Sequence, residues 1–326
     1  MDTVSVIVPV YNCAAQVGRC MESLLGQTKA VEIVAVDDGS TDDSAAVLEG
    51  YARAYPDRIR LIRQENTGVT GARLAGIRAA AGAWIGFVDG DDAVEPGMFQ
   101  RLLASAQASR AEIAHCGHQV CYQDGRVDYV FNTGIRWVHG QAEGLRDLLD
   151  GGQINSSLCT KLFRRELFAG IEDWMDLSLK NGEDLLMNYY LFSGAKRSVY
   201  EDVCPYRYYL REGSASHRRF DEHALFDPVR ARERILERCQ PELRPDAERA
   251  LLRNLLFAYA LASRRPKQES QAYRARARAQ LAARRERFFL LSPRNRLLAR
   301  MICAAPWAFD FSYGVYARLF QRREEH

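Results

Sequence analysis

The first 120 residues alternate between short apolar runs and segments with a helical spacing of apolar residues. The runs VSVIVPV (4–10) and VEIVAVDD (31–38) have the composition of strands that are buried on both faces, as in a parallel sheet. Further strands are predicted at 58–63, 84–89 and 112–120, and helices at about 14–26, 43–55, 70–81 and 96–109. Because strands and helices alternate across short turns, we predict a doubly wound α/β sheet.

The alternation weakens after residue 120. A hairpin is predicted around 120–133 with Asp124-Gly125 as its turn, followed by helices near 141–150, 160–169 and 183–193 and a strand near 206–211. From 222 onward the pattern is helical and rich in Arg and Ala. We therefore expect a catalytic or binding domain at 1–221 and a separate helical region at 222–326.

Charge separates the same two parts. Residues 230–326 contain 22 Arg or Lys and 10 Asp or Glu. Residues 1–229 contain 23 Arg or Lys and 32 Asp or Glu. An acidic front and a basic rear indicate different partners for the two parts. No span is apolar enough to cross a bilayer and the first residues lack the features of a signal peptide, so we expect a cytoplasmic protein.

Polar clusters follow several predicted strands, and FVDGDD (87–92) is the most distinctive. Carboxyl ends of parallel strands share one edge of a sheet, which is where such folds bind ligands. A calcium loop counted from Asp89 fails, because its sixth position is Val94 and its twelfth is Gln100. The aspartates indicate instead a site for Mg²⁺ or Mn²⁺ shared with substrate phosphates; the alternative is a solvated acidic turn.

Two further clusters each allow a functional and an ordinary interpretation. Asp37 to Asp42 either caps the next helix or places a carboxylate against a base or ribose. The glycine-containing segment 66–73 either is a plain strand-to-helix turn or lets a phosphate approach the helix N-terminus, where Arg73 would meet an anion. Neither a Walker loop nor a GxGxxG fingerprint is present.

Two more clusters lie in the second half of the first part. Glu183 and Asp184 open a predicted helix, where acidic residues suit the dipole, but one of them could instead act as a general base. Arg211 and His217 follow the strand near 206–211, where they could contact a diphosphate and a metal, or lie in a surface loop.

Taken together, these segments resemble family 2 glycosyltransferases with the GT-A fold, of the bacterial surface-polysaccharide type. The resemblance covers about residues 3–217. It rests on five motifs in the family's order: VSVIVPVYN (4–12), VDDGSTDDS (36–44), NTGVTGARLAG (66–76), FVDGDD (87–92) and NGEDLLMN (181–188). It implies a GT-A mixed sheet with a nucleotide-sugar half at about 1–110, an acceptor half at about 111–221 and a helical extension.

The resemblance also implies roles for single residues. Asp184 would be the catalytic base, with Glu183 as the second choice. Asp91 and Asp89 would hold Mn²⁺ or Mg²⁺, joined by His217. The donor, most often a UDP-sugar, would be bound by Pro9, Tyr11, Asn12, Asp38, Arg73, Asp89, Gly90 and Arg211. Lys161-Leu162-Phe163 resembles a segment near the acceptor. The family usually has Asn where this chain has Leu74.

The implied reaction is an inverting transfer of a hexose or N-acetylhexosamine from a UDP-sugar to a glycan or lipid-linked glycan. In the segment 291–323 arginines frame Trp307, Phe309 and Phe311, a pattern that suits either an anionic membrane surface or ordinary packing of helices. A peripheral protein on the inner face of the plasma membrane would fit the first interpretation. The basic segment has no fold motif of a nucleic-acid reader.

Three rival functions remain open on sequence alone. A nucleotide-binding oxidoreductase is disfavoured by the missing glycine fingerprint. A nucleotidyltransferase would also use paired aspartates and a metal ion. A non-catalytic nucleotide-sugar-binding protein would keep the donor residues without turnover.

Overall fold

The structure is a computed structural model that describes residues 3–130, 132–210 and 220–312. The chain divides into two compact units, Met1–Arg218 and Arg219–His326. Each unit has its own core and is described by itself below.

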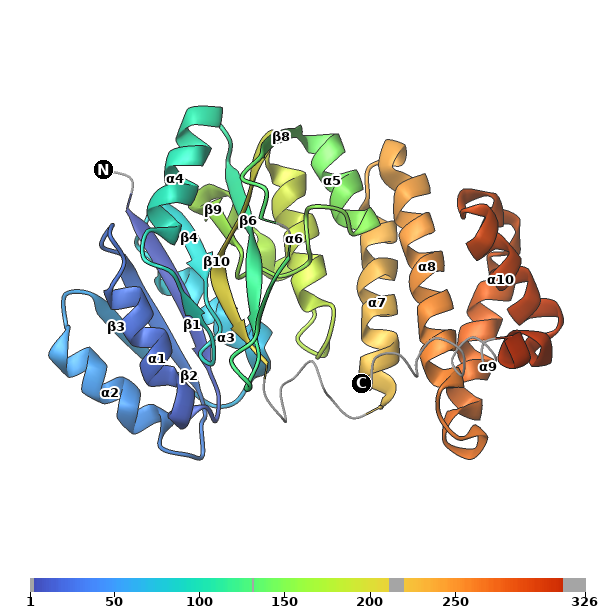
Figure 1. Ribbon diagram of the computed structural model, residues 1–326, viewed down its shortest axis with the longest axis horizontal. Helices are drawn as coiled ribbons and strands as arrows, with labels where there is room; N and C mark the ends of the chain where they lie inside the picture. Colours follow the sequence, from blue (N-terminus) through green and yellow to red (C-terminus); the bar gives the residue numbers. More distant parts are fainter. Residues whose placement is uncertain (1–2, 131, 211–219, 313–326) are drawn as a thin grey trace. The chain divides into compact units, whose positions relative to one another are not determined.

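The described part of the first unit contains a ten-stranded mixed sheet with the main order β3-β2-β1-β4-β9-β6-β10-β5 (Figure 1). Neighbours β1, β2, β3 and β4 are parallel, whereas β9 runs antiparallel to both β4 and β6. The strands are β1 Val4–Val10, β2 Glu32–Asp38, β3 Ile59–Gln64, β4 Trp84–Phe87, β5 Ala93–Val94, β6 Ile113–Cys121, β7 Val127–Tyr129, β8 Arg136–Gly140, β9 Lys161–Arg164 and β10 Arg197–Tyr209. The predicted fold class, a doubly wound mixed sheet, is confirmed.

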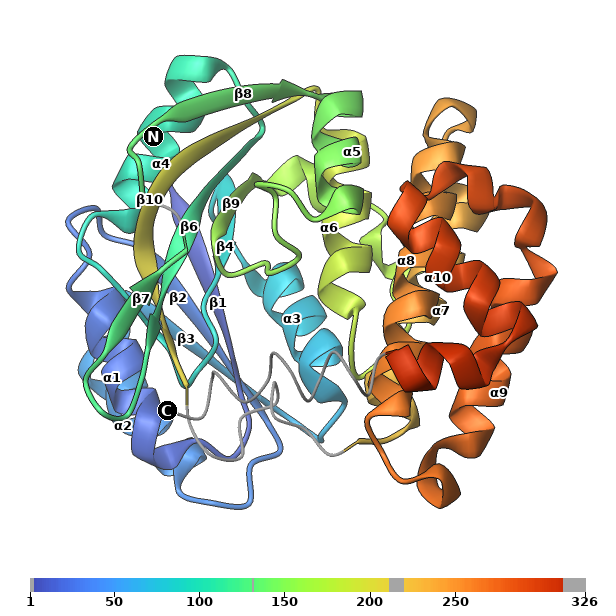
Figure 2. The ribbon, with the colours of Figure 1, turned by 45° about the vertical axis from the view of Figure 1, so that its right-hand side comes forward.

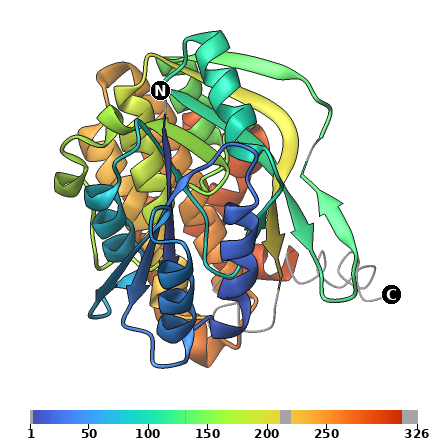
Figure 3. The same ribbon diagram turned by 90° about the vertical axis from the view of Figure 1, so that its left-hand side faces the viewer.

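Helices cover the sheet on both faces. α1 and α2 lie on one side of the parallel strands and α3 on the other (Figures 2 and 3), as right-handed crossovers in this strand order require. The helices of this unit are α1 Ala14–Leu25, α2 Ser44–Ala54, α3 Gly68–Ala79, α4 Met98–Ser109, α5 Gln141–Asp150 and α6 Glu183–Gly194. Every residue of β1 is buried, which explains its unbroken apolar sequence.

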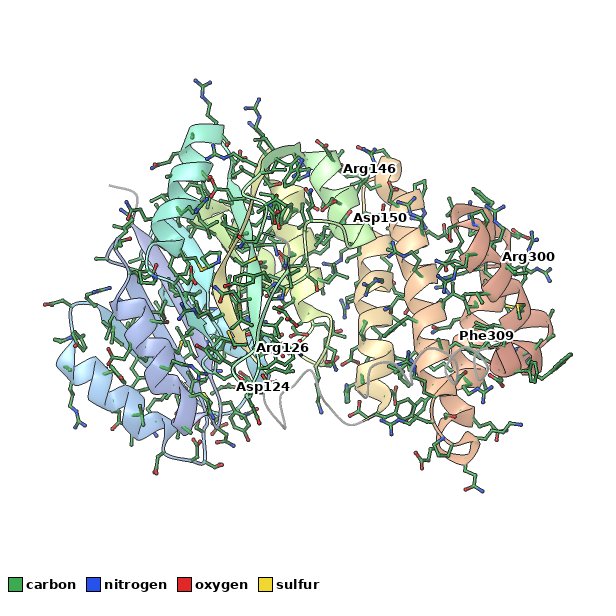
Figure 4. The ribbon with its side chains drawn as sticks, in the orientation of Figure 1. Asp124, Arg126, Arg146, Asp150, Arg300 and Phe309 are labelled. Atoms are coloured by element: carbon green, nitrogen blue, oxygen red, sulfur yellow. The ribbon has the colours of Figure 1, made fainter. Side chains whose placement is uncertain are left out.

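The predicted hairpin after residue 120 is confirmed, and the helix predicted at 160–169 is wrong. Strands β6 and β7 are joined by a turn that contains Asp124 and Gly125. The φ of Gly125 is 87°, which favours glycine. Figure 4 labels Asp124 and Arg126 at this turn. Residues 161–164 instead form β9, inserted between β4 and β6 with Leu162 and Phe163 fully buried. A short 3₁₀ segment, Arg165–Phe168, follows it directly.

The second unit is helical, as predicted. Its described helices are α7 Glu222–Arg238, α8 Arg244–Ser263, α9 Lys267–Ala283 and α10 Pro293–Ala304. They bury a common apolar core that includes Phe226, Leu255, Tyr259, Leu281 and Ile302. Among the described residues, no helix combines the length and apolar character needed to span a membrane.

Candidate active site

A cavity of about 720 Å³ opens at the carboxyl ends of β1, β2 and β4 in the first unit. The doubly wound sheet brings strand ends that are far apart in the sequence to this one edge. Most residues singled out in the sequence line the cavity: Pro9, Tyr11, Asp38, Arg73, Asp89, Gly90, Asp91, Glu183 and Asp184. The sequence motifs therefore converge on one site.

The turn after β4 presents two aspartates to this cavity. The strand's pairing with β1 continues through a hydrogen bond from the Val88 N–H to the Ile7 carbonyl, and the Asp92 N–H closes the turn on the Asp89 carbonyl at 3.0 Å. A Cβ on Gly90 would lie 3.0–3.2 Å from atoms at the end of β1 and in Cys13. Glycine therefore lets the turn pack tightly enough against β1 for Asp89 and Asp91 to face the cavity.

Arg73 is the positive centre of the site. Its side chain is only 4% exposed, and Nη2 donates to Asp89 Oδ1 at 3.2 Å while Nη1 donates to Asp184 Oδ1. Glu183 Oε1 lies 3.8 Å from Nη1. Burial alone would lower the pKa of Arg73, but the carboxylates of Asp184 and Asp89 outweigh it and raise that pKa. The guanidinium of Arg73, near the start of α3, thus neutralises carboxylates of the protein.

One arginine does not balance all the carboxylates. Removal from water, followed by the Asp184 charge, raises the pKa of Glu183 to about 7. The pKa of Asp89 is raised as well, first by desolvation and then by Asp184 and Asp91, against the opposing effect of Arg73. Excess negative charge on hard oxygen donors fits a divalent cation such as Mg²⁺ or Mn²⁺.

Protein side chains alone do not make a complete cage for such a cation. Among the described residues, no group of three or more His, Cys, Asp or Glu side chains is placed to hold a metal ion. The donor set fits the usual arrangement for Mg²⁺, in which one or two carboxylates share the ion with substrate phosphates. Asp91 and Asp89 are the residues that would hold it; His217 lies outside the described residues, as does Arg211.

Asp38 lines the cavity and also fixes the start of α3. Its Oδ1 accepts from the Thr67 N–H at 2.9 Å and from Gln64 Nε2 at 2.7 Å, and its Oδ2 accepts from the Gly68 N–H at 2.9 Å. Thr67 Oγ1 also donates to Oδ1, at 3.2 Å, whereas Oδ2 accepts one hydrogen bond and a carboxylate oxygen can accept two. Asp38 is therefore both a helix cap and a candidate acceptor for a ligand N–H group.

Asn12 has a different place from the one expected. It is not among the cavity-lining residues, and its Oδ1 accepts from the Thr41 N–H at 2.8 Å. Its backbone N–H donates to Ser40 Oγ at 3.1 Å, and its φ is 50°. Asn12 thus ties the end of β1 to the turn after β2, and its neighbour Tyr11, 52% exposed, faces the cavity.

Asp184 is held from two sides at the start of α6. Arg73 donates to one carboxylate oxygen, and the Leu158 N–H approaches the other at 3.4 Å. The helix begins after Gly182, which is at a φ of 83° that favours glycine. This geometry gives Asp184 a fixed direction towards the cavity, next to Glu183.

Several residues that line the cavity were not predicted from the sequence. Leu177, Leu179, Lys180 and Tyr208 contribute to the cavity wall. The first three come from the irregular segment before α6, which has no periodic signal. Tyr208 lies near the end of β10, a strand only partly recognised because it carries Glu201, Asp202 and Pro205.

The comparisons with known proteins agree with this architecture. Residues 5–171 match the family model described as glycosyl transferase family 2. The chain is 32% identical over 228 residues to "Uncharacterized glycosyltransferase YibD" of Escherichia coli K12, covering 66% of this chain and 63% of that protein. It is 37% identical over 197 residues to "Uncharacterized glycosyltransferase EpsJ" of Bacillus subtilis 168, covering 60% and 57%. It thus spans about three fifths of these relatives.

Solved structures share the fold. The crystal structure of S. aureus TarS 1–349 in complex with UDP-GlcNAc superposes with a TM-score of 0.76 at 20% identity, covering 97% of this chain and 92% of that one. The same TarS segment in complex with UDP gives a TM-score of 0.70 at 19% identity, covering 95% and 88%. At this identity the likeness establishes the GT-A architecture.

Proposed function

The chain belongs to glycosyl transferase family 2, and we propose that it moves a hexose or N-acetylhexosamine from a UDP-sugar to a hydroxyl of a glycan or lipid-linked glycan in cell-surface polysaccharide or lipooligosaccharide synthesis. One observation carries the proposal: a single cavity joins Asp89, Asp91, Arg73, Glu183 and Asp184 at the strand ends. The UDP-GlcNAc complex of the structurally similar TarS supports a UDP-sugar as the donor class.

The donor would lie along the side of the cavity formed by β1, β2 and the β4 turn. Tyr11 offers an exposed ring to a planar base, and Asp38 offers an oxygen to a base or ribose donor group. Asp91 and Asp89 would hold Mn²⁺ or Mg²⁺, which when bound neutralises the charge that develops on the leaving diphosphate. Gly90 lets this turn lie close to the end of β1.

Asp184 is the proposed general base. Arg73 donates to one of its carboxylate oxygens and holds the group in place. A carboxylate in this position can take the proton of the acceptor hydroxyl while that oxygen attacks the anomeric carbon. The bond from that carbon to the diphosphate breaks as the new bond forms on the opposite face, so the configuration inverts. No covalent sugar–enzyme intermediate is needed.

Paired variants test which acid at the start of α6 is the base. We expect Asp184→Asn to keep UDP affinity and to lose transfer by about 10²–10⁴-fold, the usual contribution of general base catalysis. Glu183→Gln, the adjacent control, should lose far less. Full activity of Asp184→Asn would remove this residue from the mechanism, and a selective loss in Glu183→Gln would transfer the role to Glu183.

A donor panel tests the function itself. The protein is incubated with UDP-, GDP-, CMP- and dTDP-sugars plus Mn²⁺ or Mg²⁺, and nucleotide release is measured, with EDTA as the control. We expect slow UDP release from one UDP-sugar, abolished by EDTA. In a parallel incubation, pyrophosphate release from a nucleoside triphosphate and a sugar 1-phosphate would instead indicate a nucleotidyltransferase. Binding of a nucleotide sugar without any release would indicate a nucleotide-sugar-binding protein.

We also propose that the second unit attaches the enzyme to the anionic inner face of the plasma membrane. Arg294, Leu297 and Arg300 lie three residues apart on α10 and are all exposed, and Figure 4 labels Arg300 on this helix. Beyond α10, Trp307 is 74% exposed and Phe311 is 72% exposed. Arginines beside exposed aromatic groups suit anionic lipid headgroups over an apolar interior.

Vesicle co-sedimentation tests this attachment. Wild type should sediment with phosphatidylcholine vesicles containing phosphatidylglycerol and much less with phosphatidylcholine alone. The double variant Trp307→Ser/Phe311→Ser should lose binding, whereas Phe257→Ser, at an exposed phenylalanine on α8, should keep it. Equal binding by the double variant would contradict the proposal, as would a concentration-dependent dimer disrupted by the same changes.

A further inference from the structure

Asp92, the third aspartate of FVDGDD, is oriented away from the cavity. Its side chain is 1% exposed, and it is not among the cavity-lining residues. Its Oδ2 accepts from the Tyr206 hydroxyl at 2.5 Å, and its Oδ1 accepts from the Tyr209 N–H at 3.0 Å. Both oxygens are thus bound to β10, so Asp92 connects the turn after β4 to a strand more than a hundred residues later.

Tyr206 contacts the opposite end of the same turn. Its hydroxyl oxygen accepts from the Asp89 N–H at 3.4 Å while its proton is donated to Asp92. Strand pairing places it opposite Val94 of β5, and the Glu95 N–H donates to the Pro205 carbonyl at 2.8 Å. Because Tyr206 is 3% exposed, its hydroxyl bridges both ends of the turn inside the protein.

Arg19 of α1 holds the middle of the turn. Its Nη2 donates to the Asp91 carbonyl oxygen at 2.6 Å. The guanidinium carbon of Arg19 lies 3.5 Å from the ring centroid of Tyr209, whose N–H binds Asp92. Contacts from α1 and β10 therefore fix backbone atoms at both Asp89 and Asp91.

From these contacts we propose that Arg19, Asp92 and Tyr206 form a turn clamp that positions the carboxylates of Asp89 and Asp91 for the donor diphosphate and its cation. The members of the turn clamp are positioning residues, since they act through Asp89 and Asp91. The inference rests on the proposed function for its ligand, whereas the clamp itself rests on the contacts above. Misplacement of reacting groups by about 1 Å can reduce a rate by about 10²-fold.

The chain offers a closely matched pair of variants. Tyr206→Phe removes one buried hydroxyl from β10 at the turn clamp. Tyr200→Phe removes one from the same strand at a site outside the cavity, where Tyr200 is 2% exposed and its hydroxyl donates to Asp202 Oδ1 at 2.9 Å. Loss of a buried hydrogen bond should lower the melting temperature of both variants to a similar extent.

Two measurements separate the turn clamp from general destabilisation. Hydrogen–deuterium exchange without metal should be faster in the peptide containing residues 88–92 of Tyr206→Phe than in wild type or Tyr200→Phe. Calorimetric titration of Mn²⁺ at saturating UDP should give about a tenfold weaker Kd for Tyr206→Phe only, within the range found for groups that orient metal ligands. Asp92→Asn should behave like Tyr206→Phe.

The outcomes distinguish the inference from the function on which it rests. Unchanged exchange at 88–92 in both Tyr206→Phe and Asp92→Asn would overturn the turn clamp. An unchanged Mn²⁺ affinity in both variants, with wild type binding normally, would overturn its effect on the ligand. If exchange accelerates but wild type itself binds no Mn²⁺ with UDP, the clamp stands and the metal assignment fails.

Discussion

Arg73 balances the charges of the site at the scale of a single residue. Its buried guanidinium contacts Asp89 and Asp184, which come from the turn after β4 and the start of α6. Without it, these carboxylates would face each other across a poorly solvated space. The arginine therefore offsets the repulsion between the two carboxylates and holds both side chains at one cavity.

Replacing Arg73 should disturb folding as well as chemistry. We predict that Arg73→Gln lowers the free energy of unfolding by about 1–3 kcal/mol, because it leaves hydrogen-bonding partners of a buried charged group without their donor. Urea unfolding measures the change, and Arg78→Gln is the control, since Arg78 is an exposed residue of the same helix paired with Glu172. Equal stability of the two variants would contradict a central role for Arg73.

Lys161 gives a pH-dependent prediction at the same scale. Its side chain is fully buried and its Nζ donates to the carbonyl oxygens of Asn155 and Ser157. Burial lowers the pKa of Lys161 to about 7, although the nearby charge of Asp184 opposes this. In the unfolded chain the pKa of a lysine is about 10.4.

Between these two pKa values the unfolded state binds more protons than the folded state, so stability rises with pH. We predict that wild type gains stability relative to Lys161→Met as the pH rises from 7 to 9, by at most about 1.4 kcal/mol per pH unit. The difference between the two proteins, from urea unfolding at each pH, removes the shared titration of other groups. His115, which packs nearby, has its pKa lowered well below 6.5 and does not change charge in this range. A constant difference would contradict a depressed pKa at Lys161.

The sequence motifs predicted where the site lies better than they predicted the role of each side chain. Asp89, Asp91 and Asp184 reach the cavity because strand ends and a helix start share one sheet edge. The roles of Asn12 and Asp92 were not predictable, because their partners come from other segments of the chain. The spacing of residues along the sequence does not indicate which side-chain oxygen will accept a hydrogen bond from such a partner.

At the scale of elements, the contact between α3 and β1 sets the position of Arg73. Gly76 faces β1 at the closest approach, where an added Cβ would lie 2.4 Å from Ile7 Cγ2. Since both are buried, neither element can move away without disturbing the sheet. Glycine at this position is therefore a packing requirement.

Two alanine substitutions test this packing. We predict that Gly76→Ala destabilises the protein by about 1–3 kcal/mol, as overpacked cores do. Gly50→Ala, in the exposed middle of α2 with no atom within 4 Å of the added Cβ, should instead stabilise it by about 0.5–1 kcal/mol. Thermal unfolding of both variants measures whether each substitution raises or lowers the stability. An unchanged stability of Gly76→Ala would mean that α3 can shift.

The segment 160–169 shows why one element was predicted wrongly. Its spacing of apolar residues fits a helix, but Leu162 and Phe163 fill a place between two strands that only the assembled sheet creates. Burial against β4 and β6 then outweighs the local preference. The strands before residue 120 were predictable because their apolar runs are flanked by clear turn signals.

At the scale of the whole molecule, the fold class was predictable and the acceptor was not. Alternating elements and strand-end motifs indicate a doubly wound sheet with one ligand edge. Cavity-lining groups such as Leu177, Lys180 and Tyr208 come from irregular segments and a long strand, whose positions depend on tertiary contacts.

At this scale we propose that Asp91 links a divalent cation to the binding of a UDP-sugar. Calorimetric titration of UDP in Mn²⁺ and in EDTA, for wild type and for Asp91→Ala, tests it most directly. We predict at least a tenfold tighter Kd with Mn²⁺ for wild type and no metal effect for Asp91→Ala. Equal UDP affinity in Mn²⁺ and EDTA for wild type, or an undiminished metal effect in Asp91→Ala, would contradict it.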